Sequence, residues 1–130
     1  MLVVCVHNAG RSQMAAGFLR VLSRGAIIVH SGGSEPADRV NPAAIAAMLE
    51  VGIDISGETP ARFDAADVAT ADIVITMGCG DTCPVFPGKR YEDWALDDPA
   101  GLGVEAVRPI RDEIRRRVEA LLVDLGVSGL

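Results

Sequence analysis

The stretch Cys5-Val6-His7-Asn8-Ala9-Gly10-Arg11-Ser12 separates an apolar run from an amphipathic segment, and it decides the fold. Residues 1–6 are apolar and rich in valine, which predicts a buried β-strand. Residues 12–24 place Met14 and Phe18 on one face, which predicts a helix. A strand, a polar turn and a helix in this order begin a parallel α/β sheet, in which ligands bind beyond the carboxyl ends of the strands.

The same turn has the composition of an anion-binding loop that carries a nucleophile. Its backbone amides and the helix N-terminus form a cradle for an anion. Gly10 lets the chain turn without a clash of a Cβ atom, and the planar fork of Arg11 suits two oxygens of a tetrahedral anion. These positive surroundings and the Ser12 hydroxyl favour the thiolate of Cys5. We therefore predict Cys5 as nucleophile and Arg11 as anion clamp, with substrate bound by Val6, His7, Asn8, Ala9, Gly10, Arg11 and Ser12.

Three alternatives stay open within this loop. His7 has the chemistry of an acid or base, but we favour a position on the loop surface. Asn8 either braces the loop through hydrogen bonds to backbone or is merely solvated. Cys5 and Arg11 could also be a buried strand cysteine beside a surface arginine. Their placement between an apolar strand and a helix argues against that interpretation.

The rest of the chain continues the alternation of strands and helices. Further strands are predicted at residues 26–30, 72–77 and 91–94, and helices at residues 42–50 and 64–69. The last helix carries an apolar stripe at spacings of three and four, and Pro109 predicts a kink or a helix start within it. The stripe consists of Val107, Ile110, Ile114, Val118, Leu121 and Leu125. This order predicts an α/β fold with a parallel sheet covered by helices on both faces.

Length and composition limit the classes of protein that fit. The 130 residues suit one domain spanning residues 1–130, and nearly half of them are hydrophobic. A net charge of −6 argues against a nucleic-acid partner. No apolar run is long enough to span a membrane, so we expect no membrane partner. We also expect a monomer. Three cysteines do not indicate a disulfide framework, which favours a reducing, cytoplasmic location.

The chain resembles low-molecular-weight protein tyrosine phosphatases and the arsenate reductases built on that fold. The resemblance rests on the loop above and on further motifs along nearly the whole chain. These are Ser31-Gly32-Gly33, Asn41-Pro42, Gly52-Ile53-Asp54-Ile55-Ser56, Ile75-Thr76-Met77 and Trp94-Ala95-Leu96-Asp97-Asp98-Pro99-Ala100-Gly101. It implies a three-layer sandwich in which a four-stranded parallel sheet has helices on both faces.

The resemblance also places the general acid at Asp98. Breaking a bond to arsenic or phosphorus leaves an oxygen that needs a proton, which a positioned carboxylic acid supplies. Pro99 restricts the preceding residue to an extended conformation, which helps to hold the Asp98 side chain in one direction. A purely structural role for both aspartates, capping the turn that follows, is the alternative, and we assign such a role to Asp97.

Cys79 and Cys83 indicate the branch of three-cysteine arsenate reductases that are coupled to thioredoxin. That resemblance implies a relay in which Cys5 attacks arsenate, Cys79 attacks Cys5 to release arsenite, and Cys83 attacks Cys79. At helical spacing the two Cβ atoms would be about 5–6 Å apart, whereas a disulfide needs about 3.5–4.5 Å. The pairing therefore requires a local rearrangement, which Gly78 and Gly80 permit. Two inert structural cysteines are the alternative.

The expected cofactors and the competing functions follow from the same comparison. We expect no bound cofactor and an external thiol reductant, thioredoxin in first place and mycothiol as the alternative. Some thioredoxin-coupled relatives bind potassium through an acidic residue where this chain has Ala16, so no metal site is predicted. The competing functions are an arsenate–mycothiol transferase that uses Cys5 without Cys79, a tyrosine phosphatase, and a non-catalytic oxyanion-binding module.

Overall fold

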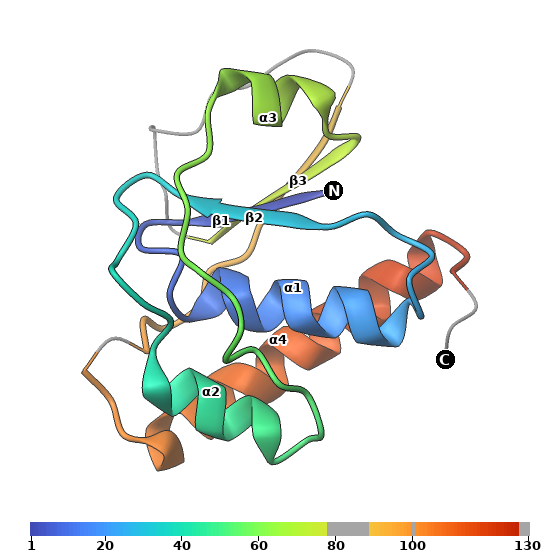
Figure 1. The fold of residues 1–130 in the computed structure, drawn as a ribbon. Coiled ribbons are helices and arrows are strands. Elements are labelled where there is room, and N and C mark those ends of the chain that lie inside the picture. The colour runs from blue at the N-terminus through green and yellow to red at the C-terminus, as the bar shows by residue number, and fades with distance from the viewer. Residues whose placement is uncertain (78–88, 100, 128–130) are drawn as a thin grey trace.

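The computed structural model describes residues 1–77, 89–99 and 101–127, and it contains a four-stranded parallel sheet (Figure 1). The strands lie in the order β2-β1-β3-β4. Their bounds are Leu2–Cys5 for β1, His30–Gly33 for β2, Ile73–Met77 for β3 and Arg90–Asp93 for β4. In this register Cys5 lies opposite Gly33 on one side and Met77 on the other. The last residue of β1 therefore reaches the carboxyl edge of the sheet between its two neighbours.

Helices cover both faces of the sheet, as the sequence predicted. Helices α1, α2 and α4 lie on one face and α3 on the other (Figure 1). Their bounds are Arg11–Leu22 for α1, Pro42–Leu49 for α2, Ala65–Thr70 for α3 and Val104–Asp124 for α4. Alternate residues of β1 enter two separate cores: Val3 and Cys5 pack with α1 and α4, whereas Leu2 and Val4 pack with Val68 of α3. The predicted three-layer α/β architecture is confirmed.

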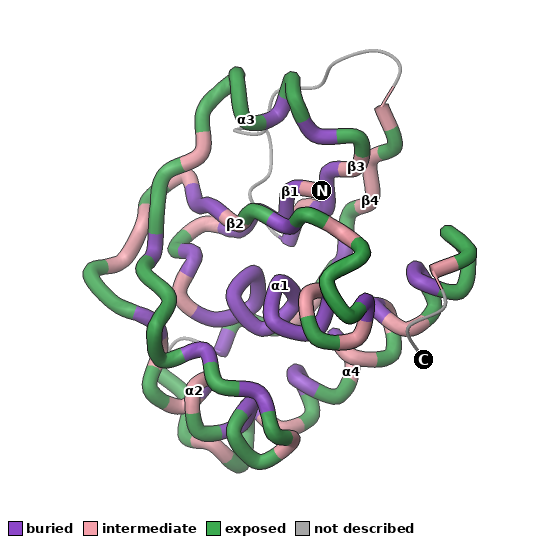
Figure 2. Tube along the Cα trace, turned by 45° about the vertical axis from the view of Figure 1, so that its right-hand side comes forward, coloured by how far each residue is buried: buried purple, intermediate pink, exposed green. Residues whose placement is uncertain are grey.

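Helix α1 is buried on all sides along most of its length (Figure 2). It is enclosed because the sheet covers one side and α4 the other. Even its polar first residues, Arg11, Ser12 and Gln13, are buried. Buried polar groups are costly unless they are hydrogen-bonded. The start of α1 must therefore be rich in specific polar contacts.

The predicted strand at residues 26–30 is wrong, because the pairing strand is His30–Gly33. The apolar run before it does not enter the sheet, and Ile28 is 78% exposed. Instead, the strand contains glycines that another segment approaches closely. A Cβ atom on Gly32 would lie 2.8 Å from Cβ of Phe63. The position of this strand therefore follows the residues that pack closely and not the most hydrophobic run.

The last helix begins at Val104, so a start at Pro109 is wrong, and the proline lies inside the helix. Its side chain is exposed, so the backbone hydrogen bond that proline removes lies where water can replace it. Val107, Ile110, Ile114, Val118 and Leu121 of the predicted stripe are buried, whereas Leu125 lies beyond the helix and is 36% exposed. Of the helices in the described residues, none is long and apolar enough to cross a membrane.

Glu50 joins the end of α2 to α4 through two arginines. Its Oε1 accepts from Nε of Arg108 at 2.9 Å and from Nη1 of Arg111 at 2.7 Å, and its Oε2 accepts from Nη2 of Arg108 at 2.6 Å. Arg111 is itself buried, and its Nη1 also donates to the Ala47 carbonyl. The hydrogen bonds from Arg108, then those from Arg111, lower the pKa of Glu50 from 4.5 to about 2.

We expect Glu50→Gln to destabilise the protein at neutral pH, and the difference from wild type to shrink in acid. Because the folded-state pKa is depressed, the stabilisation is complete above pH 4.5 and is lost as the pH falls toward 2. Urea unfolding at pH 7 and at pH 3 measures the two differences. Glu119→Gln, in the exposed pair with Arg115, is the control and should change little at either pH. A Glu50→Gln difference that is the same at both pH values would contradict the assignment.

Candidate active site

The carbonyl oxygens of the loop after β1 accept hydrogen bonds from neighbouring parts of the chain. The carbonyls of Cys5 and Val6 accept from the amides of Ser34 and Glu35 at 3.3 Å and 2.8 Å. Two more bonds continue this pairing with the neighbouring segment, from Ala37 N to His7 O at 2.9 Å and from Asn41 N to Ala9 O at 2.8 Å. The Asn8 carbonyl accepts from the Gln13 side chain at 3.1 Å, and the Gly10 carbonyl accepts from Met14 N at 2.9 Å.

This arrangement leaves backbone donors at the start of α1 for a ligand. Within the described residues, no backbone acceptor is paired with the amides of His7, Ala9, Gly10 or Arg11. The N-cap residue Gly10 has no side chain to cap the helix. Unpaired amides at a helix N-terminus attract anions through both hydrogen bonds and the helix dipole. The loop and the start of α1 therefore hold the donors that an anion cradle needs, and anion binding by them stays a prediction.

Asn8 braces the loop, and it is fully buried with a φ of 50°. Its Oδ1 accepts from the Ala61 amide at 3.0 Å and from Nε2 of Gln13 at 3.2 Å. Because a backbone amide can only donate, this contact fixes which end of the Asn8 side chain is oxygen. Nδ2 therefore faces Ser12, donating to its Oγ at 2.7 Å. The bracing role is confirmed as geometry, and the solvated alternative is wrong.

Cys5 is buried at the end of β1 with two polar neighbours on its sulfur. The Asn8 amide donates to Sγ at 3.2 Å, and Oγ of Ser12 lies 2.9 Å from Sγ. The Ser12 oxygen already accepts from Asn8, so its own hydrogen is available to point at the sulfur. Two hydrogen-bond donors therefore converge on the Cys5 sulfur.

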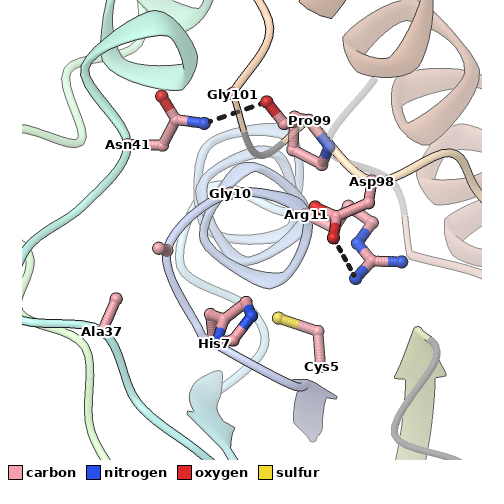
Figure 3. A pocket seen from close by; sticks show the side chains of 10 residues that line it. Cys5, His7, Gly10, Arg11, Ala37, Asn41, Asp98, Pro99 and Gly101 are labelled. Atoms are coloured by element: carbon pink, nitrogen blue, oxygen red, sulfur yellow. Dashed lines mark hydrogen bonds and ion pairs between the residues drawn. The ribbon is translucent and has the colours of Figure 1, made fainter.

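Cys5 opens into a pocket of about 250 Å³ at the carboxyl edge of the sheet (Figure 3). The pocket is lined by Cys5, His7, Ala9, Gly10, Arg11, Ala37, Asn41, Asp98, Pro99 and Gly101. Figure 3 shows the side chains of Cys5, Arg11 and Asp98 around this space. No Phe, Tyr or Trp side chain is among the described residues of the lining. The described lining brings together a thiol, a guanidinium and a carboxylate, from Cys5, Arg11 and Asp98.

Arg11 and Asp98 approach each other across the pocket. Nη2 of Arg11 lies 4.0 Å from Oδ2 of Asp98, and Nη1 donates to the Leu96 carbonyl at 3.3 Å. The Arg11 side chain is 10% exposed and that of Asp98 is 53% exposed. Pro99 packs on Gly10 so closely that a Cβ atom there would lie 2.6 Å from its Cγ. Gly10 is thus required because Pro99 lies so close to it. The residue of the loop with a left-handed backbone conformation is Asn8.

The structure brings most of the predicted site residues together. Cys5, His7, Ala9, Gly10, Arg11 and Asp98 line the pocket, whereas Asn8 and Ser12 lie beneath it and Val6 is not among the lining residues. His7 is exposed, as we favoured, and its Nδ1 lies 3.1 Å from the Glu35 carbonyl. That oxygen can only accept, so Nδ1 carries the hydrogen. The predicted residues Cys79 and Cys83 lie outside the described residues.

The sequence did not indicate that two further residues, Gln13 and Asn41, contribute to the site. Gln13 holds both oxygens of Asn8, and Asn41 donates through Nδ2 to the Pro99 carbonyl at 3.3 Å. Gln13 had a weak signal, since a glutamine in the first turn of a buried helix needs polar partners. Asn41 was explained by helix capping, which it does perform, because Oδ1 accepts from Ala43 N at 2.9 Å.

Known proteins are similar to this chain along almost its whole length. The family described as low molecular weight phosphotyrosine protein phosphatase matches residues 1–128. The chain is 42% identical over 128 residues to the glutaredoxin arsenate reductase of Synechocystis sp., covering 96% of this chain and 97% of that protein.

Two solved structures are similar to it along almost its whole length. The thioredoxin-dependent arsenate reductase of Corynebacterium glutamicum has a TM-score of 0.86 at 38% identity, covering 98% of this chain. This chain spans 61% of the length of that one. A second structure, an arsenate reductase in the phosphate binding state, has a TM-score of 0.80 at 42% identity, with 98% and 97% of the two chains covered.

Proposed function

The chain belongs to the low molecular weight phosphotyrosine protein phosphatase family, and from that premise we propose that it is an arsenate reductase. In this proposal Cys5 attacks arsenate bound in the loop from Cys5 to Arg11. The observation that carries it is the Cys5 sulfur, which has two donors within 3.2 Å and lies beside loop amides that have no backbone acceptor among the described residues. Relatives that are 41–42% identical to this chain are named arsenate reductases, which supports arsenate as the substrate.

The first step forms a bond between sulfur and arsenic. Arsenate occupies the cradle, with the amides of the loop and the guanidinium of Arg11 on its oxygens. The Cys5 thiolate attacks arsenic, one arsenic–oxygen bond breaks, and Asp98 donates the proton with which that oxygen leaves as water. The contact of Arg11 with both the Leu96 carbonyl and Asp98 supports this division of roles, because it holds the clamp beside the acid.

The second part of the proposal is a relay of thiols that reduces arsenic. Cys79 attacks the Cys5 sulfur, a disulfide forms, and the electron pair of the sulfur–arsenic bond stays on arsenic, which leaves as arsenite. Cys83 then attacks Cys79, which frees Cys5 as a thiolate and leaves a Cys79–Cys83 disulfide. Two thiols are oxidised for each arsenic reduced, so the electrons balance.

An external dithiol protein such as thioredoxin then reduces the Cys79–Cys83 disulfide. A thioredoxin-dependent relative among the solved structures supports this choice. Because the relay needs reduced cysteines, we assign the protein to the cytoplasm. The second candidate is transfer of arsenate from Cys5 to a small thiol, for which mycothiol is our example. The name of the Synechocystis relative refers to glutaredoxin, which supports a reductant other than thioredoxin as the alternative.

Hydrolysis of aryl phosphates is the activity that this pocket supports least. Phosphate and arsenate have nearly the same shape, so the cradle does not separate them. An aryl leaving group would gain from aromatic neighbours, and the described lining offers none. We therefore expect weak phosphatase activity at most.

Trapping the relay tests this proposal. We expect Cys83→Ser, reduced and then treated with arsenate once, to accumulate a Cys5–Cys79 disulfide, because the thiol that resolves it is missing. Peptide mapping by mass spectrometry detects the bond. The double variant Cys79→Ser/Cys83→Ser is the matched control and should accumulate none. A Cys83→Ser chain that keeps all its thiols free and accumulates no disulfide would overturn the relay, and full turnover of Cys79→Ser with small thiols alone would favour the transferase.

A further inference from the structure

We propose that Asn41 is a positioning residue that holds the proton donor Asp98 in place through the Pro99 carbonyl, an inference that rests on the proposed function. Asn41 lies at a junction of three parts of the site. Its backbone amide donates to Ala9 O in the anion loop at 2.8 Å. Its Oδ1 caps α2 through Ala43 N at 2.9 Å, and its Nδ2 donates to Pro99 O at 3.3 Å. Figure 3 shows this last bond across the rim of the pocket.

The segment that carries Asp98 is anchored on both sides of this residue, whose side chain is 53% exposed. On the side before Asp98, Nη1 of Arg11 holds the Leu96 carbonyl at 3.3 Å. Arg11 is also the proposed clamp of the anion, so its donors are shared with the substrate. On the side after Asp98, the bond from Asn41 to Pro99 uses no group that the mechanism assigns to the anion. It therefore keeps the acid in register with the loop whether or not substrate is bound.

The two ends of the Asn41 side chain perform separable tasks. The Ala43 amide can only donate, which fixes Oδ1 as the capping atom and leaves Nδ2 for Pro99. Serine is as good a helix cap as asparagine, but its hydroxyl is too short to replace Nδ2. Asn41→Ser therefore keeps the cap, cuts the tether and adds no charge. Asn41→Asp also keeps the cap and replaces the donor with an acceptor, so it serves as a second variant.

A double-mutant cycle with Asp98→Asn tests whether Asn41 acts through the acid. The measurement is kcat/KM for arsenate with dithiothreitol as reductant. Loss of a general acid lowers rates by roughly 10²-fold or more, and we expect Asn41→Ser to lower kcat/KM about tenfold in the wild-type background. In the Asp98→Asn background we expect a change below about twofold, because the group being positioned is gone.

Two further measurements separate this role from binding or folding. Inorganic phosphate should bind Asn41→Ser within about twofold of wild type, since the cradle amides are unchanged. Asp64→Ser alters the cap of the remote helix α3 and should leave kcat/KM at the wild-type value. A tenfold loss in both backgrounds, or a matching loss of phosphate binding, would overturn the positioning role. Full activity of Asp98→Asn would overturn it together with the proposed acid, and that single variant tells the two failures apart.

Discussion

Cys5→Ser is expected to lower arsenate reduction by at least about 10³-fold, the range in which removal of a catalytic nucleophile falls. The serine hydroxyl occupies nearly the same space, but it is not ionised at neutral pH and attacks arsenic far more slowly. The donors from Asn8 and Ser12 would then face an oxygen in place of the sulfur. No other thiol among the described residues lines the pocket to take over the attack.

The same variant should still bind anions, and this separates chemistry from binding. The proposed cradle consists of backbone amides and Arg11, none of which the substitution changes. We expect inorganic phosphate to bind Cys5→Ser within a few-fold of wild type by titration calorimetry. Arsenite formation by Cys5→Ser at more than about a tenth of the wild-type rate would exclude Cys5 as the nucleophile.

Arg11→Lys should produce the second largest loss, about 10²-fold in kcat/KM for arsenate. Lysine keeps the positive charge but lacks the planar fork that places two donors on two oxygens. It also has fewer donors to share between the Leu96 carbonyl and Asp98, which Arg11 contacts from one guanidinium, and the anion that we propose it binds. Charge alone therefore does not replace this side chain.

Arg111→Lys is a matched control for this prediction, because Arg111 is buried to a similar extent, 8% exposed against 9% for Arg11. Arg111 also donates to a backbone carbonyl and a carboxylate, but it does so between α2 and α4. We expect Arg111→Lys to lower the denaturant midpoint and to leave kcat/KM per folded molecule unchanged. An Arg11→Lys enzyme with wild-type kcat/KM would contradict the clamp.

The sequence predicted those parts of the fold and site that local order determines. The loop from Cys5 to Arg11 is continuous in the chain, so a strand before it and a helix after it were sufficient to predict a cradle. The contact of the Cys5 sulfur with Ser12 could also be predicted, because Ser12 directly follows this loop in the sequence. The alternation of strands and helices predicted the layers for the same reason.

What the sequence did not predict depends on contacts between distant segments. Strand β2 was placed too early because an apolar run indicated it, whereas the pairing strand ends in Gly32 and Gly33, where Phe63 and the Val6 carbonyl leave no room for a Cβ atom. The tether from Asn41 to Pro99 joins residues 58 positions apart, and capping alone had already explained Asn41. The contact of Pro99 with Gly10 was invisible for the same reason. The pairing of Cys79 with Cys83 stays a prediction.

A single turnover with arsenate tests the central claim most directly. The fully reduced wild-type chain is mixed with excess arsenate and no reductant, and the arsenite released and the thiols remaining are both counted. The account predicts one arsenite per chain, two of the three cysteine thiols lost, and Cys5 recovered as a free thiol once the relay is complete. A chain that retains all its thiols and releases no arsenite would contradict the account.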